Sequence, residues 1–232
     1  MIIGGFQGFS LIDYPDKICA IVFTQGCNFR CPYCHNPELI DTKRSRSDRF
    51  KEEEILSFLE RRQGKLEAVT ITGGEPLLQA GLEGFLLKVK GLGYLAKLDT
   101  NGSFPQRLEK ILESKTVDYI AMDIKTSLDK YESVVRKKVE TAQILKSIRL
   151  IMDSGLDYEF RTTVVKPLFE KDDFIKIGQL VEDCRLYVLQ GFVSSNSKML
   201  DDECLDMHSY SDEELASFKH IMEGFVQRCT VR

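Results

Sequence analysis

Short apolar runs alternate along this chain with longer segments in which apolar residues recur every three to four positions. The first run, residues 18–24, is continuous and contains β-branched side chains, which is typical of a strand covered on both faces. Later runs of the same kind predict five further strands, at residues 68–72, 94–100, 117–124, 158–165 and 186–190.

Helical periodicity fills most of the intervals between these runs. Gly64 follows the first periodic segment as a C-terminal cap, and Ser211 with Glu214 has the pattern of a capping box at the start of the last. The six predicted helices cover residues 52–62, 77–90, 106–113, 139–154, 172–183 and 212–227.

Strands that alternate with helices indicate an α/β fold, with a parallel sheet and right-handed crossovers. An open doubly wound sheet and a partly closed barrel both fit six strands, and the pattern does not separate them. In either fold, functional groups lie where strands end and the following loops begin. No repeat, low-complexity segment or linker interrupts residues 1–232, so we expect a single domain.

The composition is that of an ordinary globular protein. With 43% hydrophobic and 29% charged residues, 16 Gly and 6 Pro, the chain is neither collagen-like nor disordered. Its apolar runs fall far short of the roughly 18 residues that span a bilayer, and no secretory signal opens it. We therefore expect a cytoplasmic protein that does not contact a membrane.

The charge is nearly balanced, at −4 from 32 basic and 36 acidic residues, which argues against a nucleic-acid surface. Basic residues gather at 43–51 and acidic residues at 201–206. Solvated loops explain both segments, and a docking surface for a protein partner is the alternative.

The spacing of the cysteines indicates a metal centre. Cys27, Cys31 and Cys34 fall within eight residues, and three thiolates from one loop can hold a [4Fe–4S] cluster while leaving one iron open. A Cys₃His zinc site with His35 is an alternative, although His35 directly follows Cys34 and is poorly placed to close a tetrahedron. Three unliganded thiols are a third. The remaining cysteines are single, as expected for small core residues: Cys19, Cys184, Cys204 and Cys229.

Polar residues also follow the other predicted strands. Residues 73–76, Gly-Gly-Glu-Pro, fit a tight turn in which Pro76 starts the next helix. The two glycines would equally let a small ligand approach the backbone, with the Glu75 carboxylate facing a cationic group. The later strand ends carry Asp99, Thr100, Asp123, Lys125, Arg161 and Gln190.

Taken together, these motifs resemble the radical S-adenosylmethionine superfamily. The C-x₃-C-x₂-C loop, with Tyr33 before its last cysteine, followed by Gly-Gly-Glu-Pro after the next strand, is a highly specific combination. Three further segments resemble the glycyl-radical-enzyme activases: residues 34–37, 99–102 and 122–125.

The opening of the chain sharpens the resemblance. Gly5-Phe6-Gln7, with Leu-Ile-Asp-Tyr-Pro at residues 11–15, is similar to the activating proteins of anaerobic ribonucleoside-triphosphate reductase. The specific likeness covers residues 1–165, and beyond them only the rhythm of strands and helices and Gln190 support it.

The resemblance implies a partial (β/α)₆ TIM-like barrel with parallel strands. It implies that Cys27, Cys31 and Cys34 hold a [4Fe–4S] cluster whose fourth iron is chelated by S-adenosylmethionine. The other residues that it implies in cofactor binding are Tyr33 at the adenine, Gly73, Gly74 and Glu75 at the methionine ammonium, and Asp99, Thr100, Asp123, Lys125 and Arg161.

Two of these roles have alternatives. In the related pyruvate formate-lyase activases, the residues matching Asp99, Thr100 and Asp123 contribute to a monovalent-cation site, while Lys125 would hold the methionine carboxylate. A solvated turn and a surface ion pair would explain the same residues without a ligand. Arg161 fits either a cofactor contact or a partner for an acid. His35 is a weaker candidate, as a base.

By resemblance, the chain is an oxidoreductase that cleaves S-adenosylmethionine reductively to a 5′-deoxyadenosyl radical. The substrate would be a glycine of anaerobic ribonucleoside-triphosphate reductase, with flavodoxin or ferredoxin as the electron donor. An activase of pyruvate formate-lyase or another glycyl-radical enzyme is the second hypothesis. A non-enzymatic zinc-binding module is the third.

Overall fold

The computed structural model of the chain describes residues 1–41, 50–193 and 207–232. These residues form two compact units, and each is built from separated stretches of the chain. The first comprises Met1–Asn28, Glu38–Thr100 and Phe104–Ile120, and the second comprises Phe29–Pro37, Asn101–Ser103 and Ala121–Arg232. The prediction of a single domain stays a prediction.

The first unit holds three parallel strands that follow one another in chain order. β2 (Cys19–Thr24) pairs in parallel with β3 (Ala68–Gly73), which pairs in parallel with β4 (Leu95–Thr100). β1 (Ile3–Ser10) adds an antiparallel strand at the outer edge of β2, where Phe6 lies opposite Val22. The sequence pattern did not predict β1.

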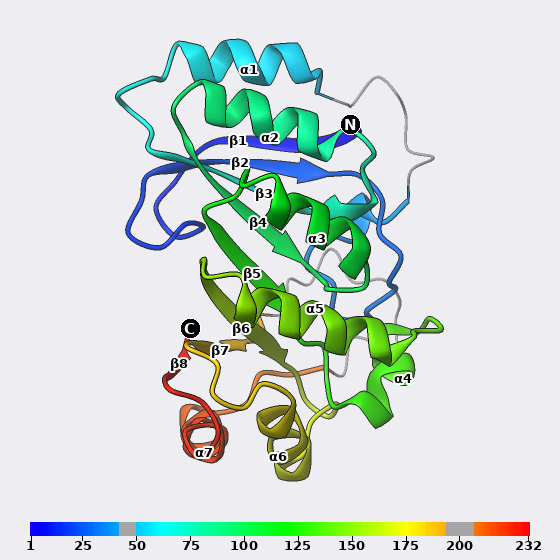
Figure 1. Cartoon of the computed structure of the whole chain (residues 1–232). Coiled ribbons are helices and arrows are strands. Elements are labelled where there is room, and N and C mark those ends of the chain that lie inside the picture. The colour runs from blue at the N-terminus through cyan, green and yellow to red at the C-terminus, as the bar shows by residue number, and fades with distance from the viewer. Residues whose placement is uncertain (42–49, 194–206) are drawn as a thin grey trace. The chain divides into compact units, whose positions relative to one another are not determined.

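Helices connect these strands, as the periodicity predicted. α1 (Glu52–Glu60) lies alongside α2 (Leu82–Gly91), and α3 (Pro105–Glu113) follows β4 (Figure 1). Three acidic residues lie in the first turn of α1, where their negative charges interact favourably with the positive end of the helix dipole and stabilise the helix. The apolar stripe of α2 is buried through Phe85, Leu86 and Val89.

The second unit continues the alternation. β5 (Tyr119–Asp123) begins in the first unit and ends in the second, where β6 (Asp157–Val164), β7 (Tyr187–Gly191) and the short β8 (Cys229–Val231) pair in parallel. Its helices are α4 (Tyr131–Val135), α5 (Thr141–Asp153), α6 (Lys171–Leu180) and α7 (Asp212–Met222).

Aromatic packing joins the last two helices of this unit. α6 and α7 run side by side (Figure 1). The rings of Phe174 and Phe218 stack on one another, with their centroids 4.3 Å apart. The predicted capping box is present, since the Glu214 amide donates to Ser211 Oγ at 3.3 Å and the Ser211 amide donates to Glu214 at 2.8 Å.

The structure therefore confirms an α/β fold with parallel strands and all six predicted strands. β1, β8 and α4 are additions that the sequence pattern missed. Within the described ranges, no helix combines the length and the apolar character that crossing a membrane requires.

Candidate functional site

The cysteine loop starts directly after β2, and backbone hydrogen bonds fix it at several points. In the first unit, the Gly26 amide donates to the Leu39 carbonyl at 2.7 Å and the Cys27 amide to the Ile40 carbonyl at 3.2 Å. In the second, the Arg30 amide donates to the Val135 carbonyl at 2.9 Å. The loop backbone is therefore ordered by main-chain contacts of the protein itself.

The three candidate thiolates differ in exposure. Cys31 is buried, whereas Cys27 and Cys34 are half-buried, and the Cys34 amide donates to the Cys31 carbonyl at 3.1 Å. In the part of the chain that is described, no group of three or more His, Cys, Asp and Glu residues is gathered for a metal ion. Three thiols on one ordered loop suit the donor chemistry of an iron–sulfur cluster, and their role as its ligands stays a prediction from spacing.

His35 packs against an aromatic ring of the second unit. Its imidazole stacks on Phe192 with centroids 5.9 Å apart, and burial lowers the pKa of His35 below its usual value. This packing accounts for the position of His35 without a metal ion.

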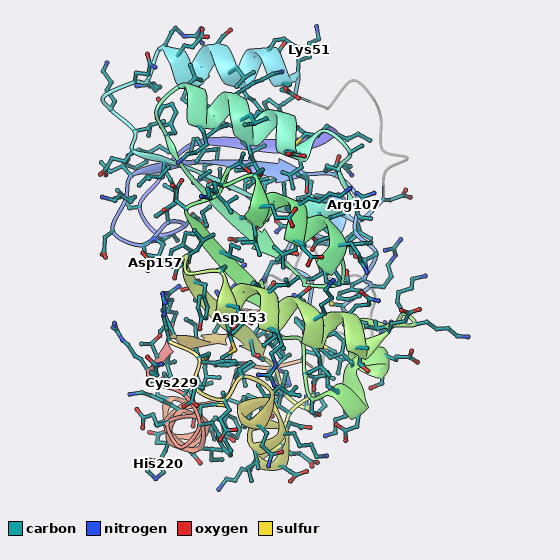
Figure 2. All side chains as sticks on the ribbon, in the orientation of Figure 1. Lys51, Arg107, Asp153, Asp157, His220 and Cys229 are labelled. Atoms are coloured by element: carbon teal, nitrogen blue, oxygen red, sulfur yellow. The ribbon has the colours of Figure 1, made fainter. Side chains whose placement is uncertain are left out.

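The remaining described cysteines are core residues, as predicted. Cys19, Cys184 and Cys229 are buried, and burial raises the pKa of the Cys184 and Cys229 thiols to about 12. Cys229, on β8, is labelled in Figure 2. Cys204 lies outside the described residues.

Two other predictions fall on residues that the structure does not describe. These are the basic segment 43–51, apart from its last two residues, and the acidic segment 201–206.

The Gly-Gly-Glu-Pro turn at the end of β3 packs directly on the base of the cysteine loop. The Gly74 amide donates to the Thr24 carbonyl at 2.9 Å, and the Glu75 amide to the Gly26 carbonyl at 2.8 Å. A Cβ atom on Gly74 would lie 2.2 Å from the Gly26 carbonyl oxygen. Gly73 has a φ of 108°, and its Cβ would lie 2.4 Å from the Thr24 amide nitrogen. Close backbone packing thus accounts for both glycines.

The Glu75 side chain is fully buried. Its Oε1 accepts hydrogen bonds from the Leu77 amide at 3.0 Å and from the Thr100 hydroxyl at 2.8 Å. Pro76 begins the short 3₁₀ helix η3 (Pro76–Leu78), which Glu75 caps. The turn that the sequence predicted is confirmed, and it places a carboxylate inside the protein beside the cysteine loop.

Because the backbone leaves no space beside Gly74, we expect Gly74→Ala to destabilise the protein by about 3 kcal/mol, the upper range for overpacking. Gly84→Ala is the matched control, since Gly84 lies within α2 with open space around it, and we expect it to stabilise by about 0.5–1 kcal/mol. Urea unfolding of both variants measures the difference, and equal stabilities would contradict the packing argument.

β4 carries an ion pair that the sequence reading missed. Lys97 Nζ lies 2.7 Å from Asp99 Oδ1, and their side chains are 3% and 11% exposed. The two residues are two positions apart on one strand and therefore share a face of the sheet. The spacing of two residues between Lys97 and Asp99 could have indicated this pair, since a lysine inside an apolar strand is rarely buried without a partner of opposite charge.

In the second unit, Asp123 lies between two cationic groups. Arg161 Nε donates to Asp123 Oδ1 at 2.5 Å, and Lys125 Nζ donates to Oδ2 at 2.9 Å. Burial alone would raise the pKa of Asp123, but Arg161 and Lys125 outweigh burial and hold that pKa well below its usual range. Asp123 is therefore ionised at neutral pH.

Lys125 is in turn held by its surroundings. Burial lowers its pKa, but the charge of Asp123 more than compensates and keeps the pKa well above its usual value. The Tyr33 hydroxyl donates to the Lys125 carbonyl at 3.4 Å, and burial raises the pKa of Tyr33, so this hydroxyl keeps its proton. Tyr33, Asp123, Lys125 and Arg161 thus lie together in the second unit, as the sequence predicted for strand ends.

Arg161 has a second acidic neighbour that sequence reasoning missed. Glu159 Oε1 lies 3.8 Å from the Arg161 guanidinium, and the Glu159 carboxylate receives two hydrogen bonds from Arg232, at 2.8 and 3.2 Å. The structure thus supports the reading of Arg161 as a partner for acids.

The proposed monovalent-cation site does not fit the charges that the structure shows. Asp99 has the Lys97 ammonium beside it in the first unit, and Asp123 has two cations beside it in the second. The Thr100 hydroxyl donates to Glu75. Both carboxylates are therefore neutralised by side chains of the protein.

Since Asp123 balances two cations, we expect Asp123→Asn to destabilise the protein by about 1–3 kcal/mol at pH 7. The folded-state pKa is depressed, so this stability is present above the unfolded value near 3.9 and is lost as the pH falls toward the folded value. The difference in the free energy of unfolding between the wild type and Asp123→Asn should therefore become smaller below about pH 4. Asp129→Asn, which removes an exposed carboxylate beside Lys176, should change little. A difference in stability that does not depend on pH would contradict an ionised Asp123 paired with Arg161 and Lys125.

Known proteins resemble this chain over most of its length. Residues 21–181 match the sequence model of the Radical SAM superfamily. A Methanocaldococcus jannaschii protein, MJ1227, provisionally named as a glycyl-radical enzyme activating enzyme, is 32% identical over 237 residues, spanning 100% of this chain and 95% of its own. A pyruvate formate-lyase-activating enzyme of Streptococcus mutans is 32% identical over 195 residues, covering 78% of this chain and 72% of its own.

Solved structures share the fold at low sequence identity. Streptococcus suis SuiB bound to its precursor peptide SuiA gives a TM-score of 0.70 at 13% identity, covering 91% of this chain and 48% of SuiB. A domain of a pyruvate-formate lyase-activating enzyme from Bacteroides vulgatus gives 0.57 at 18%, covering 72% of this chain and 99% of the domain. The α/β fold with parallel strands agrees with the partial barrel of these radical S-adenosylmethionine enzymes.

The family is shown by the likeness of residues 21–181 to the Radical SAM superfamily and by the identity to these two relatives. This chain belongs to the radical S-adenosylmethionine superfamily and, within it, to the enzymes that activate glycyl-radical enzymes.

Proposed function

We propose that this enzyme installs a glycyl radical on an anaerobic ribonucleoside-triphosphate reductase and receives its electron from a flavodoxin or ferredoxin. The superfamily uses a [4Fe–4S] cluster and S-adenosylmethionine, and the activating enzymes act on glycyl-radical enzymes. The choice of the reductase rests on the opening of the chain, the Gly5-Phe6-Gln7 segment with residues 11–15, which lies in β1 and the loop after it.

One observation of the structure carries the proposal furthest. Backbone hydrogen bonds join the turn that bears Glu75 to the base of the loop that bears Cys27. A candidate cluster ligand and a buried carboxylate are thereby held in one rigid part of the first unit. This arrangement suits an enzyme that must hold a cationic ligand next to a metal centre.

The residue roles are those that the family resemblance implies, and the chemistry of each side chain is compatible with its role. Glu75 would accept a hydrogen bond from the ammonium of the methionine moiety, a charge-assisted contact that burial would strengthen. Lys125 would donate a hydrogen bond to the methionine carboxylate, while Asp123 and the Tyr33 hydroxyl fix the lysine in place. Arg161 orients Asp123 and keeps it ionised.

The cofactors supply the difficult chemistry. When bound, the cluster and S-adenosylmethionine provide, by one-electron cleavage, the radical that takes a hydrogen atom from the glycine Cα. The products are 5′-deoxyadenosine, methionine and a glycyl radical. Glycine suits this reaction because its flanking amides delocalise the radical and no side chain blocks access.

The test separates the class of enzyme from its partner. Anaerobically reconstituted protein is first assayed with dithionite for 5′-deoxyadenosine and methionine. It is then incubated with S-adenosylmethionine and either the reductase or pyruvate formate-lyase, and electron paramagnetic resonance looks for the glycyl doublet. We expect the doublet on the reductase.

A doublet on pyruvate formate-lyase alone would reject the reductase and establish the second candidate, which the relative from Streptococcus mutans favours. Zinc near one equivalent, with no cluster absorption after reconstitution, would instead reject the cluster.

A further inference from the structure

Lys97 is an unusual residue within the parallel strands of the first unit. It lies in the middle of β4, opposite Thr70 of β3, and is 3% exposed. Its ammonium lies 6.0 Å from the centroid of the Tyr119 ring. Lysine is almost never buried to this degree unless an opposite charge pairs with it, because an isolated ammonium is strongly disfavoured away from water.

The opposite charge is Asp99. Lys97 Nζ lies 2.7 Å from Asp99 Oδ1, and the whole Asp99 residue, backbone included, is 9% exposed. At this distance and depth, the attraction is far stronger than that of an ion pair in water, and a buried carboxylate stripped of its cation is costly. Each member of the pair thus accounts for the burial of the other.

An ammonium is a compact single positive charge that presents hydrogen-bond donors to surrounding oxygen atoms. A monovalent metal ion would offer the same charge to the same carboxylate. The two cannot both contact Asp99 Oδ1 without repelling one another, because each would lie within a few ångströms of the other.

The structure assigns the place of a monovalent metal ion beside Asp99 to the Lys97 ammonium. This protein therefore carries its own cation there and does not take up sodium or potassium. This assignment does not rest on the proposed function, because ion binding is measured without S-adenosylmethionine. The assignment and the proposed function can therefore fail separately.

The experiment measures ion binding without S-adenosylmethionine. Anaerobically reconstituted wild type, Lys97→Met and Asp99→Asn are titrated with NaCl at constant ionic strength while ²³Na NMR relaxation is recorded. Wild type should show no saturable sodium relaxation. Lys97→Met, which removes the ammonium beside Asp99 at similar side-chain length, should gain a saturable component that KCl displaces.

Thermal unfolding supplies a second readout. Lys97→Met should unfold about 3 °C higher in NaCl than in choline chloride once sodium exceeds its dissociation constant about tenfold, whereas wild type should not distinguish the salts. Lys90→Met is the matched control. Lys90 lies 2.7 Å from Asp118 in the same unit, but that carboxylate is 28% exposed, so water can solvate it and no sodium dependence should appear.

Two results would overturn the assignment. Saturable sodium binding to wild type that Asp99→Asn removes would show that a metal ion shares the carboxylate with Lys97. A folded Lys97→Met protein with no sodium dependence would show that the place beside Asp99 does not accept a metal ion. Should Lys97→Met fail to fold, Lys97→Gln takes its place, and the wild-type measurement still decides.

Discussion

Replacing Cys27, Cys31 or Cys34 by Ala is expected to lower reductive cleavage of S-adenosylmethionine at least about a thousandfold, about 4 kcal/mol in activation free energy. The reason is that three thiolates are the smallest set that holds a four-iron cluster while leaving one iron open. Loss of any one removes the centre that delivers the electron. Iron and sulfide content after reconstitution and 5′-deoxyadenosine formation measure the effect.

Controls come from the buried cysteines of the same chain. Cys19→Ala and Cys229→Ala remove thiols from β2 and β8, where burial raises the pKa and keeps each thiol protonated. These variants should lose some stability but keep the cluster and the cleavage activity. Full activity in Cys31→Ala, or equal loss in all five variants, would contradict the ligand assignment.

The pattern of apolar residues predicted the strands well because a strand buried on both faces is a continuous apolar run. β1 escaped that rule. Its sequence, Ile3–Ser10, contains three glycines, which have low strand propensity, and few of the β-branched residues that favour strands. It is a strand because β2 offers an unpaired edge, and Phe6 pairs there with Val22. Local sequence does not contain that information.

The candidate site was predictable to the extent that parallel strands place their carboxyl ends along one edge. Asp123, Lys125 and Arg161 came from that rule, and the structure brings them into contact. The pairing itself was beyond the sequence, because Arg161 and Asp123 are 38 residues apart.

Glu159 and Arg232 lie 73 residues apart, and no local signal connects them. For the glycines, the sequence allowed two readings. Gly74 is required by the backbone of Gly26, which only the packed structure reveals.

Glu75→Gln is expected to weaken S-adenosylmethionine binding by about 10- to 100-fold, since a hydrogen bond to a charged group contributes about 1.5–3 kcal/mol. The variant keeps an oxygen that can accept from the Leu77 amide and the Thr100 hydroxyl, so the cap of η3 survives. Stability and cluster content should therefore change little. Equilibrium binding to the oxidised, reconstituted protein measures the affinity without turnover.

Two further variants separate charge from capping. Glu67→Gln neutralises an exposed glutamate of the same unit that pairs with Lys17, and it should bind the cofactor as the wild type does. Glu75→Ala removes both the charge and the cap, so it should lose about 1 kcal/mol of stability in addition to affinity. If Glu75→Gln binds normally with an intact cluster, Glu75 is a structural cap, and the ammonium must be held by another acceptor of the chain.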